Sequence, residues 1–219
     1  MLEVSSIKKD YIWKEILVNS LVILTCLILF LKLPTANSFQ ETCKELFFLV
    51  IIPLSYIKLV LKKNFKEFGF SLSFKKSDFF WAGGVFLAYL IIFFCLINFT
   101  DFKANYHISK SIQNNFEAFL FFELIIFNLL FLFQEIFFKG FVLFSLSPKF
   151  RSWSILITAL IYCAIIFAGK SSIWQTAPLI LFSFMGSWLA YKNNSIWLAY
   201  ATSLLSLILL DSFLIFISK

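Results

Sequence analysis

The fold of this chain is decided by one stretch, Phe119–Leu146, which reads FLFFELIIFNLLFLFQEIFFKGFVLFSL. It is apolar apart from a few polar side chains, and it lacks the alternation of polar and apolar residues that marks the strand of a membrane barrel. A bilayer core about 30 Å thick requires about 20 apolar residues in a spanning helix. The stretch therefore predicts a membrane helix that is tilted or that protrudes beyond the bilayer.

The composition of the whole chain agrees with a membrane protein. Of its 219 residues, 61% are hydrophobic and 14% are charged, and the mean hydropathy is +0.90. Soluble domains average roughly 45–50% apolar and about 25% charged residues. With only 6 Gly, 4 Pro and 4 Cys, the chain is neither disordered, collagen-like nor a disulfide scaffold.

Polar residues divide the chain into seven apolar runs. They lie at about Ile16–Leu33, Leu46–Leu61, Phe79–Phe99, Phe119–Leu146, Trp153–Gly169, Trp174–Tyr191 and Ile196–Ile217. The sequence thus predicts an all-α, polytopic bundle of about seven transmembrane helices. No repeat of fixed period and no linker divides it, so residues 1–219 are expected to form a single membrane domain.

The net charge of +7 predicts an orientation, because cytoplasmic loops of membrane proteins are enriched in Lys and Arg. With seven spans, one side of the membrane receives twelve basic residues and the other six: Lys8, Lys9, Lys14, Lys58, Lys62, Lys63, Lys66, Lys75, Lys76, Lys149, Arg151 and Lys192, against Lys32, Lys44, Lys103, Lys110, Lys170 and Lys219. The N-terminus is therefore expected in the cytoplasm. The basic stretch 58–76 is expected to face anionic lipid rather than nucleic acid.

The first apolar run is expected to remain as a helix rather than to be cleaved as a signal peptide. Basic residues precede it and Ala36 follows it. However, its apolar stretch exceeds the 7–15 residues of a usual signal-peptide core.

Ionisable side chains inside the predicted spans are candidates for function, since burying a charge in a bilayer costs about 2.5–3.5 kcal/mol on insertion scales. Glu135 and Lys139 are four residues apart on one helix, in the order that favours an ion pair. They predict either a functional site or a self-neutralised patch that packs the helix. Asp211 has no evident partner and is expected to form a hydrogen bond at the interface or within the bundle.

Other catalytic or metal centres find little support in the sequence. The one histidine, His107, falls in a polar segment between predicted spans, which argues against a Ser-His-Asp triad. No cluster of His, Cys or carboxylates has ligand spacing, so neither a metal nor another cofactor is expected. The Ser and Thr residues of the last three runs are typical of helix packing in membranes.

The heptapeptide QEIFFKG at residues 134–140 resembles the first motif of the CPBP family, which includes type II CAAX-processing endopeptidases and bacteriocin-immunity proteins. That motif is E-E-x-x-x-R, usually with Phe before the Arg and Gly after it. Glu135 matches the second Glu of the motif, and Phe138 and Gly140 match the Phe and Gly on either side of the Arg position. Lys139 stands at the Arg position, and Gln134 replaces the first Glu.

The resemblance extends over about residues 65 to 207. Upstream, Phe68-Gly69-Phe70 followed by two lysines is similar to the segment that precedes the family's core. Downstream, SWLAY at residues 187–191 and NSIW at 194–197 are similar to the stretch that leads into the family's last motif.

The resemblance implies particular roles for these positions. In the family, the first Glu and a His on the next helix activate a water for peptide hydrolysis, a second His with an Asn four residues later stabilises the oxyanion, and the second Glu and the Arg hold the architecture. Here Gln134 stands at the position of the first Glu, and Lys170 or Gly169 at that of the first His. The second His and the Asn correspond to Ser203 and Leu207, or to Thr202 and Ser206. Glu135 and Lys139 stand at the positions of the second Glu and the Arg.

These replacements remove the groups that the chemistry requires. A general base must accept a proton, and the carboxamide of Gln134 cannot, although it can hydrogen-bond a water. Glu135 points along a different helix face, and pairing with Lys139 lowers its basicity. One hydroxyl near Ser203 could donate to an oxyanion, but the loss of a single such donor typically costs about 2.7–4 kcal/mol.

The sequence thus predicts a CPBP-like protein of the bacterial cytoplasmic membrane that is catalytically impaired. We expect it to act in an assembly, in immunity or as a regulatory subunit, and to bind a peptide or a partner's transmembrane segment in a cavity near Gln134, Glu135, Lys139 and Ser203. The alternatives are an active intramembrane endopeptidase and a small transporter or channel subunit.

Overall fold

The computed structural model describes residues 2–106, 116–169 and 172–218, with side chains for 13–106, 117–169 and 172–217. All of the regular secondary structure in these residues is helical. The elements are α1 (Leu2–Lys32), α2 (Ser38–Glu45), η1 (Leu46–Ile51), α3 (Ile52–Ser55), η2 (Tyr56–Val60), η3 (Phe65–Phe68), α4 (Lys76–Phe99), α5 (Phe102–Asn105), α7 (Phe116–Phe121), η4 (Phe122–Phe127), α8 (Asn128–Glu135), η5 (Ile136–Val142), α9 (Leu143–Phe150), α10 (Trp153–Ala168), α11 (Ile173–Leu181), η6 (Phe182–Gly186), α12 (Ser187–Asn193) and α13 (Ile196–Ser218). The predicted all-α membrane bundle is confirmed.

Five helical stretches in the described part of the chain are long and apolar enough to cross a membrane. They are Trp13–Lys32, Lys76–Phe99, Glu117–Phe150, Ile173–Asn193 and Ile196–Ile217. The stretch that decides the fold is a continuous 34-residue helix from α7 to α9. At 1.5 Å per residue it is about 50 Å long, which exceeds the thickness of a bilayer core.

The remaining two predicted runs are also helical, but they are shorter. The helix over the second run extends back to Ser38, and its first part carries Glu41, Lys44 and Glu45. Its apolar part, Leu46–Val60, is therefore only about 22 Å long. Helix α10 has 16 residues, about 24 Å. Five of the seven predicted runs thus meet the length of a spanning helix.

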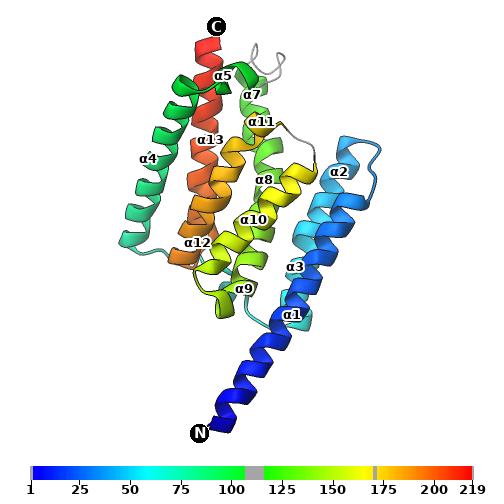
Figure 1. Cartoon of the computed structure of the whole chain (residues 1–219). Coiled ribbons are helices and arrows are strands. Elements are labelled where there is room, and N and C mark those ends of the chain that lie inside the picture. The colour runs from blue at the N-terminus through cyan, green and yellow to red at the C-terminus, as the bar shows by residue number, and fades with distance from the viewer. Residues whose placement is uncertain (1, 107–115, 170–171, 219) are drawn as a thin grey trace.

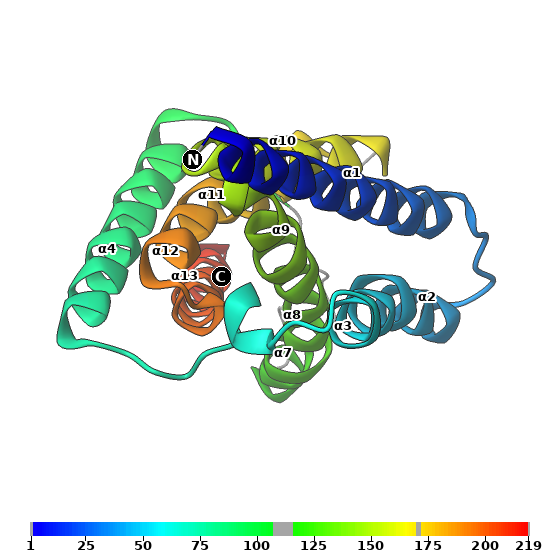
Figure 2. The same cartoon turned by 90° about the horizontal axis from the view of Figure 1, so that it is seen from below.

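The long helix α7–α9 lies in the middle of the molecule. Viewed along the bundle, α4 lies at one edge and α2–α3 at the other, with α7–α9 between them (Figure 2). Helix α13 packs against α4 and α8, α10 packs against α9 and η6, and η1 packs against α8 and η5. Helices α1 and α13 extend to opposite ends of the bundle (Figure 1).

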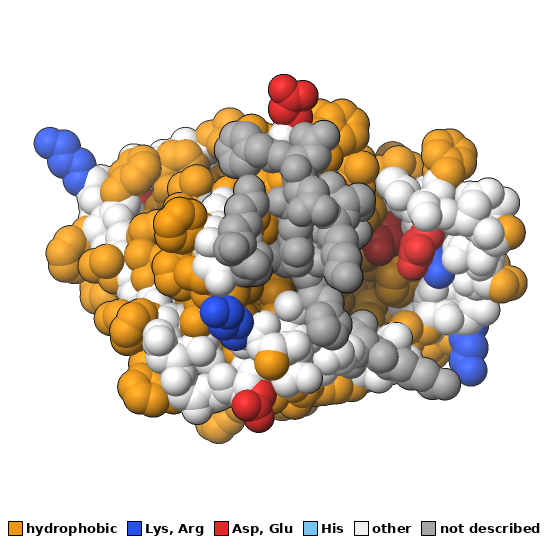
Figure 3. All heavy atoms as spheres, turned by 90° about the horizontal axis from the view of Figure 1, so that it is seen from above, with side chains coloured by type: hydrophobic (Ala, Val, Ile, Leu, Met, Phe, Trp, Pro, Cys, Tyr) orange, Lys and Arg blue, Asp and Glu red, His pale blue; other side chains and the backbone are white. Residues whose placement is uncertain are grey.

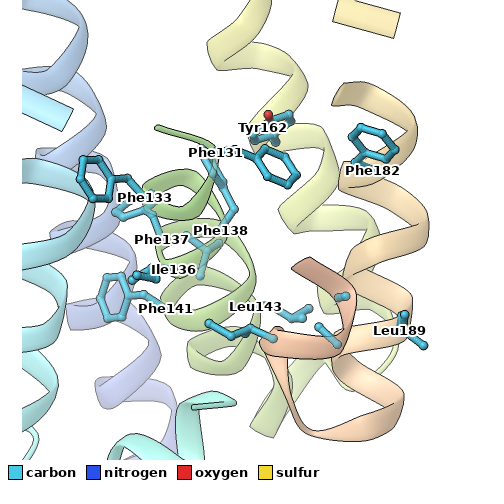
Figure 4. Close-up of a cluster of buried hydrophobic side chains, with 14 of the residues drawn as sticks. Phe131, Phe133, Ile136, Phe137, Phe138, Phe141, Leu143, Tyr162, Phe182 and Leu189 are labelled. Carbon is cyan, nitrogen blue, oxygen red and sulfur yellow. The ribbon is translucent and has the colours of Figure 1, made fainter. Parts of the chain in front are cut away.

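Aromatic side chains fill the space around the long helix. Phe137 and Phe141 are fully buried on η5, and Phe138 meets Tyr162 of α10 edge to face at 4.7 Å between ring centroids. Figure 4 shows these rings between the long helix and its neighbours, with Phe182 contributed by η6. Bulky hydrophobic side chains are also exposed on the outside, and in the view from the end that carries α5 many of them lie around the edge of the molecule, with a few charged side chains among them (Figure 3). This exposure suits a surface that faces lipid.

Two segments that carry the family resemblance meet at the end of the bundle where α4 begins. Gly69 accepts a hydrogen bond from the backbone N–H of Ile196 at 2.9 Å, and the Ser195 hydroxyl donates to the carbonyl of Ser71 at 2.7 Å. The rings of Phe70 and Trp197 stack edge to face at 6.5 Å. Residues 68–71 are therefore attached to the turn between α12 and α13, although more than 120 residues separate them.

Candidate functional site

The predicted ion pair exists and is buried. Lys139 Nζ donates to Glu135 Oε1 at 2.6 Å, and the two side chains are 2% and 6% exposed. Their four-residue spacing places both on one face of the long helix, where α8 continues into η5. The helix remains continuous there, but η5 is π-helical, with a wider turn than an α-helix. The pair is neutral as a unit, which makes its burial tolerable.

A glycine on the opposite helix makes room for the Lys139 ammonium. Gly186 ends η6, which is π-helical like η5. A Cβ atom at Gly186 would lie 2.2 Å from Lys139 Nζ and 3.4 Å from Ser203 Oγ. The ammonium and the Ser203 hydroxyl therefore approach the same backbone position, and any larger residue at Gly186 would displace the lysine.

Gln134 is engaged by the neighbouring helix rather than by the ion pair. The Tyr162 hydroxyl of α10 donates to Gln134 Oε1 at 2.8 Å. Because Gln134 is rotated about 100° from Glu135 on the helix, it faces α10. Its acceptor oxygen, the atom at the family's general-base position, thus already holds a hydrogen bond.

The cavity at the pair is small. It measures about 10 Å³ and is lined by Gln134, Glu135, Phe138, Lys139, Tyr162, Leu179, Phe182, Ser183 and Ser187. That is about the volume that a single water molecule needs. Glu135 and Ser183 line it, and neither Glu135 Oε2 nor the Ser183 hydroxyl has a hydrogen-bond partner among the residues that the structure describes. The cavity expected for a peptide is thus closed in this conformation.

The hydroxyl groups near the family's last motif have partners. Ser203 is fully buried and lies within 3.5 Å of the Tyr89 hydroxyl. Thr202 and Ser206 donate to the carbonyls of Leu198 and Thr202 on their own helix, at 2.7 and 2.8 Å. Ser203 is thus the hydroxyl of this group that approaches the ion pair, through Gly186.

Of the five residues predicted for the site, the structure gathers four around η5 and η6: Gln134, Glu135, Lys139 and Ser203. Lys170 lies outside the described residues, as does His107. Within the described ranges, no three His, Cys, Asp or Glu side chains are grouped as metal ligands.

A second polar cluster, which the sequence analysis did not foresee, lies near α5. Tyr106 and Glu123 both form hydrogen bonds with Asp211. Glu123 and Asp211 are each 5% exposed. Burial and the two carboxylates raise the pKa of Tyr106, which follows α5. Asp211 thus has partners within the bundle, which the sequence left open, and Glu123 is buried beside it.

Comparison with known families bears on the same region. Residues 114–205 match the family model described as type II CAAX prenyl endopeptidase Rce1-like. The match begins just before the long helix and ends within α13, so it includes the ion pair, Gln134 and Ser203. No curated protein and no solved structure matches the chain. Over residues 114–205, the chain is thus similar to the Rce1-like type II CAAX prenyl endopeptidases, and the resemblance to the CPBP family that the sequence indicated is confirmed over this part of the chain.

Proposed function

We propose that this Rce1-like membrane protein does not hydrolyse peptides and acts instead as a binding, immunity or regulatory subunit in a bacterial cytoplasmic membrane. Its partner would be a peptide or a transmembrane segment of another protein. The observation that supports this most directly is Gln134 at the position of the general base, with its oxygen bound by Tyr162.

The chemistry of the pair supports the same reading. Water activation requires a group that accepts a proton, and a carboxamide does not. Glu135 is the carboxylate at the adjacent position, but its Oε1 accepts a hydrogen bond from the Lys139 ammonium at 2.6 Å. Removing a proton from water would require Glu135 to become neutral and would leave Lys139 buried without its counter-ion, which is unfavourable by several kcal/mol.

The size of the cavity restricts how a partner could reach the pair. A volume of about 10 Å³ accommodates no peptide bond with its flanking side chains. Access to Glu135 and Lys139 would require η6 to separate from η5. A partner that binds without such movement would bind on the outer surface of the bundle, where hydrolysis at the pair is impossible.

A peptidase assay tests the absence of hydrolysis. The purified protein in lipid nanodiscs is incubated with a fluorogenic peptide library, beside Glu135→Gln and Gln134→Ala variants. We expect no cleavage by the wild type or by Glu135→Gln. Cleavage by the wild type that Glu135→Gln abolishes and chelators leave intact would overturn the proposal.

One observation favours the second candidate, an active endopeptidase. Within the described part of the chain, Glu135 Oε2 has no hydrogen-bond partner, and Glu135 lines the cavity together with Ser183. A water held there would contact a carboxylate oxygen. The same assay decides between the two candidates, since an enzyme that uses this oxygen would lose activity in Glu135→Gln and keep it in Gln134→Ala.

Affinity purification from the native membrane in mild detergent tests the role as a subunit. The wild type is compared with a Glu135→Leu/Lys139→Met double variant, which removes both buried charges together. We expect a copurifying membrane protein with the wild type. Its loss from a folded double variant would assign binding to the pair, whereas the absence of any stoichiometric partner from the wild type would contradict the subunit role.

A further inference from the structure

An apolar groove separates α4 from η6 and α12, away from the buried ion pair. Its volume is about 480 Å³, and it is lined by Trp81, Gly84 and Ala88 on one side and by Phe184, Met185 and Trp188 on the other. This volume lies within the range of sites that bind small molecules. The groove opens on the hydrophobic outside of the bundle, where Trp81 is 37% exposed.

A lysine lies at one end of this groove. Lys192 Nζ is 3.1 Å from the centroid of the Trp81 ring and 4.9 Å from that of Trp188. The two rings meet edge to face at 5.6 Å. The lysine is exposed, so its charge remains available to a ligand while the tryptophan faces hold the ammonium at the end of the groove.

The surroundings of this end are basic and have the composition of a membrane interface. Helix α4 begins at Lys76, directly after Lys75, and both side chains are exposed. Asp78 accepts from the backbone N–H of Lys75 and caps the helix, so it offsets part of the positive charge. Tryptophan and lysine together are typical of the level of lipid headgroups.

The length of the groove argues for a lipid chain as the occupant. From Trp81 to Ala88 it follows about two turns of α4, roughly 10 Å. A partner's transmembrane helix would need a longer face than this, and a helix is itself about 10–12 Å wide. An acyl chain is narrow and flexible enough to lie between the two helices.

We propose that this groove binds an anionic phospholipid of the bilayer, with an acyl chain between α4 and η6 and the phosphate against Lys192. The aromatic and apolar lining of the groove provides hydrophobic contact along the acyl chain. The ammonium provides a charge-assisted hydrogen bond to the phosphate. The site is independent of the proposed function at the ion pair.

Two neighbouring glycines provide a matched test. A Cβ atom at either Gly83 or Gly84 would meet no atom within 4 Å, yet Gly84 lines the groove and Gly83 does not. Gly84→Leu places a side chain inside the groove, between α4 and η6, whereas Gly83→Leu places the same side chain on the same helix outside it. Lys192→Gln removes the charge at an exposed position without altering the apolar lining.

Native mass spectrometry measures the lipid directly. The full-length protein in detergent is titrated with phosphatidylglycerol or phosphatidylcholine of the same acyl chains, and the lipid that stays bound is counted. We expect wild type and Gly83→Leu to retain one phosphatidylglycerol in preference to phosphatidylcholine. Gly84→Leu should lose it, and Lys192→Gln should lower the affinity for phosphatidylglycerol roughly fivefold, the effect of one lysine near an anionic surface.

Equal retention of the two lipids by the wild type would overturn the proposal, and so would unchanged retention by Gly84→Leu. Equal losses in the two glycine variants would assign the binding to a different surface. Should Gly84→Leu fail to fold, as judged by gel filtration, the exposed Lys192→Gln variant still decides whether the headgroup preference depends on this lysine.

Discussion

Glu135 and Lys139 act as one unit, and the stability of each depends on the other. Their contact at 2.6 Å is almost fully shielded from solvent. Breaking a buried pair by removing one partner leaves an uncompensated charge, whereas replacing both by apolar residues of similar size removes the charge altogether. The pair could be predicted from the sequence because both residues lie within one helical turn of each other.

Lys139→Met alone should therefore destabilise the protein by about 3–5 kcal/mol. The double variant Glu135→Leu/Lys139→Met should recover most of that loss. The stability of both variants is measured by unfolding in detergent, with heat or sodium dodecyl sulfate, followed through tryptophan fluorescence. A double variant as unstable as the single one would show that the pair does not act as a unit.

A side chain at Gly186 should weaken the ion pair. A Cβ atom there would lie 2.2 Å from Lys139 Nζ and 2.8 Å from its Cε. Gly186→Ala would push the ammonium away from Glu135, and overpacking of this kind costs about 1–3 kcal/mol. Gly83→Ala is the matched control, since it meets no atom and should be neutral or slightly stabilising in the same unfolding experiment.

At the scale of the elements, the sequence predicted which stretches are helical but not how their turns are wound. Among the described residues, five segments, including η5 and η6, are π-helical. Their apolar sequences do not differ from those of other membrane helices. The width of a helical turn depends on packing against neighbouring helices rather than on the pattern of apolar residues, so the sequence did not indicate π-helical turns. The bond from Tyr162 to Gln134 was equally hidden, since the two residues belong to different helices.

The connection between η3 and α4 depends on the backbone of Gly69. Its φ of 79° is left-handed, and a Cβ atom there would lie 2.4 Å from Phe144 Cε2. Gly69→Ala should destabilise the protein by at least about 1–2 kcal/mol from the backbone conformation alone. Ser195→Ala, which removes one hydrogen bond to the same segment, should cost only about 1 kcal/mol. Thermal unfolding of the two variants side by side checks this order, which the opposite ranking would contradict.

The end of α2 should make stability depend on pH. Glu45 precedes the apolar part of its helix, and burial, followed by repulsion from Glu41, raises its pKa from 4.5 to about 7, against the opposing effect of Lys44. For an acid whose pKa is higher in the folded state, stability is fully present below the unfolded value and falls as pH rises to the folded value.

Wild-type stability relative to Glu45→Gln should therefore decrease between pH 4.5 and about 7 and stay level above that. Unfolding midpoints of both proteins across this range provide the measurement, and the glutamine variant supplies the baseline for all other titrating groups. A relative stability that rises with pH would refute the buried, uncharged state of Glu45.

At the scale of the whole molecule, long-range contacts set the limit of what the sequence could predict. Asp211 was expected to form a hydrogen bond, but its partners Tyr106 and Glu123 could not be identified, because they lie on other elements and 88 or more residues away. Likewise, residues 68–70 and residues 194–197 each resemble the family, whereas their contact with each other, from Gly69 to Ile196 and from Phe70 to Trp197, could be found only in the fold.

The arrangement of the two ends allows a direct test of orientation. The basic segment that leads to α4 lies at one end of the bundle, whereas α2 begins near the other (Figure 1). Cys43 is exposed on α2. If the basic end faces the cytoplasm, as the distribution of Lys and Arg predicts, then Cys43 faces the outside.

A membrane-impermeant maleimide should therefore label Cys43 in intact cells, and Cys43→Ser should abolish that labelling. In the Cys43→Ser background, Ser73→Cys should react only after the cells are permeabilised, because Ser73 belongs to the basic segment. The reverse pattern would place the N-terminus outside, and the excess of positive charge would then require another explanation.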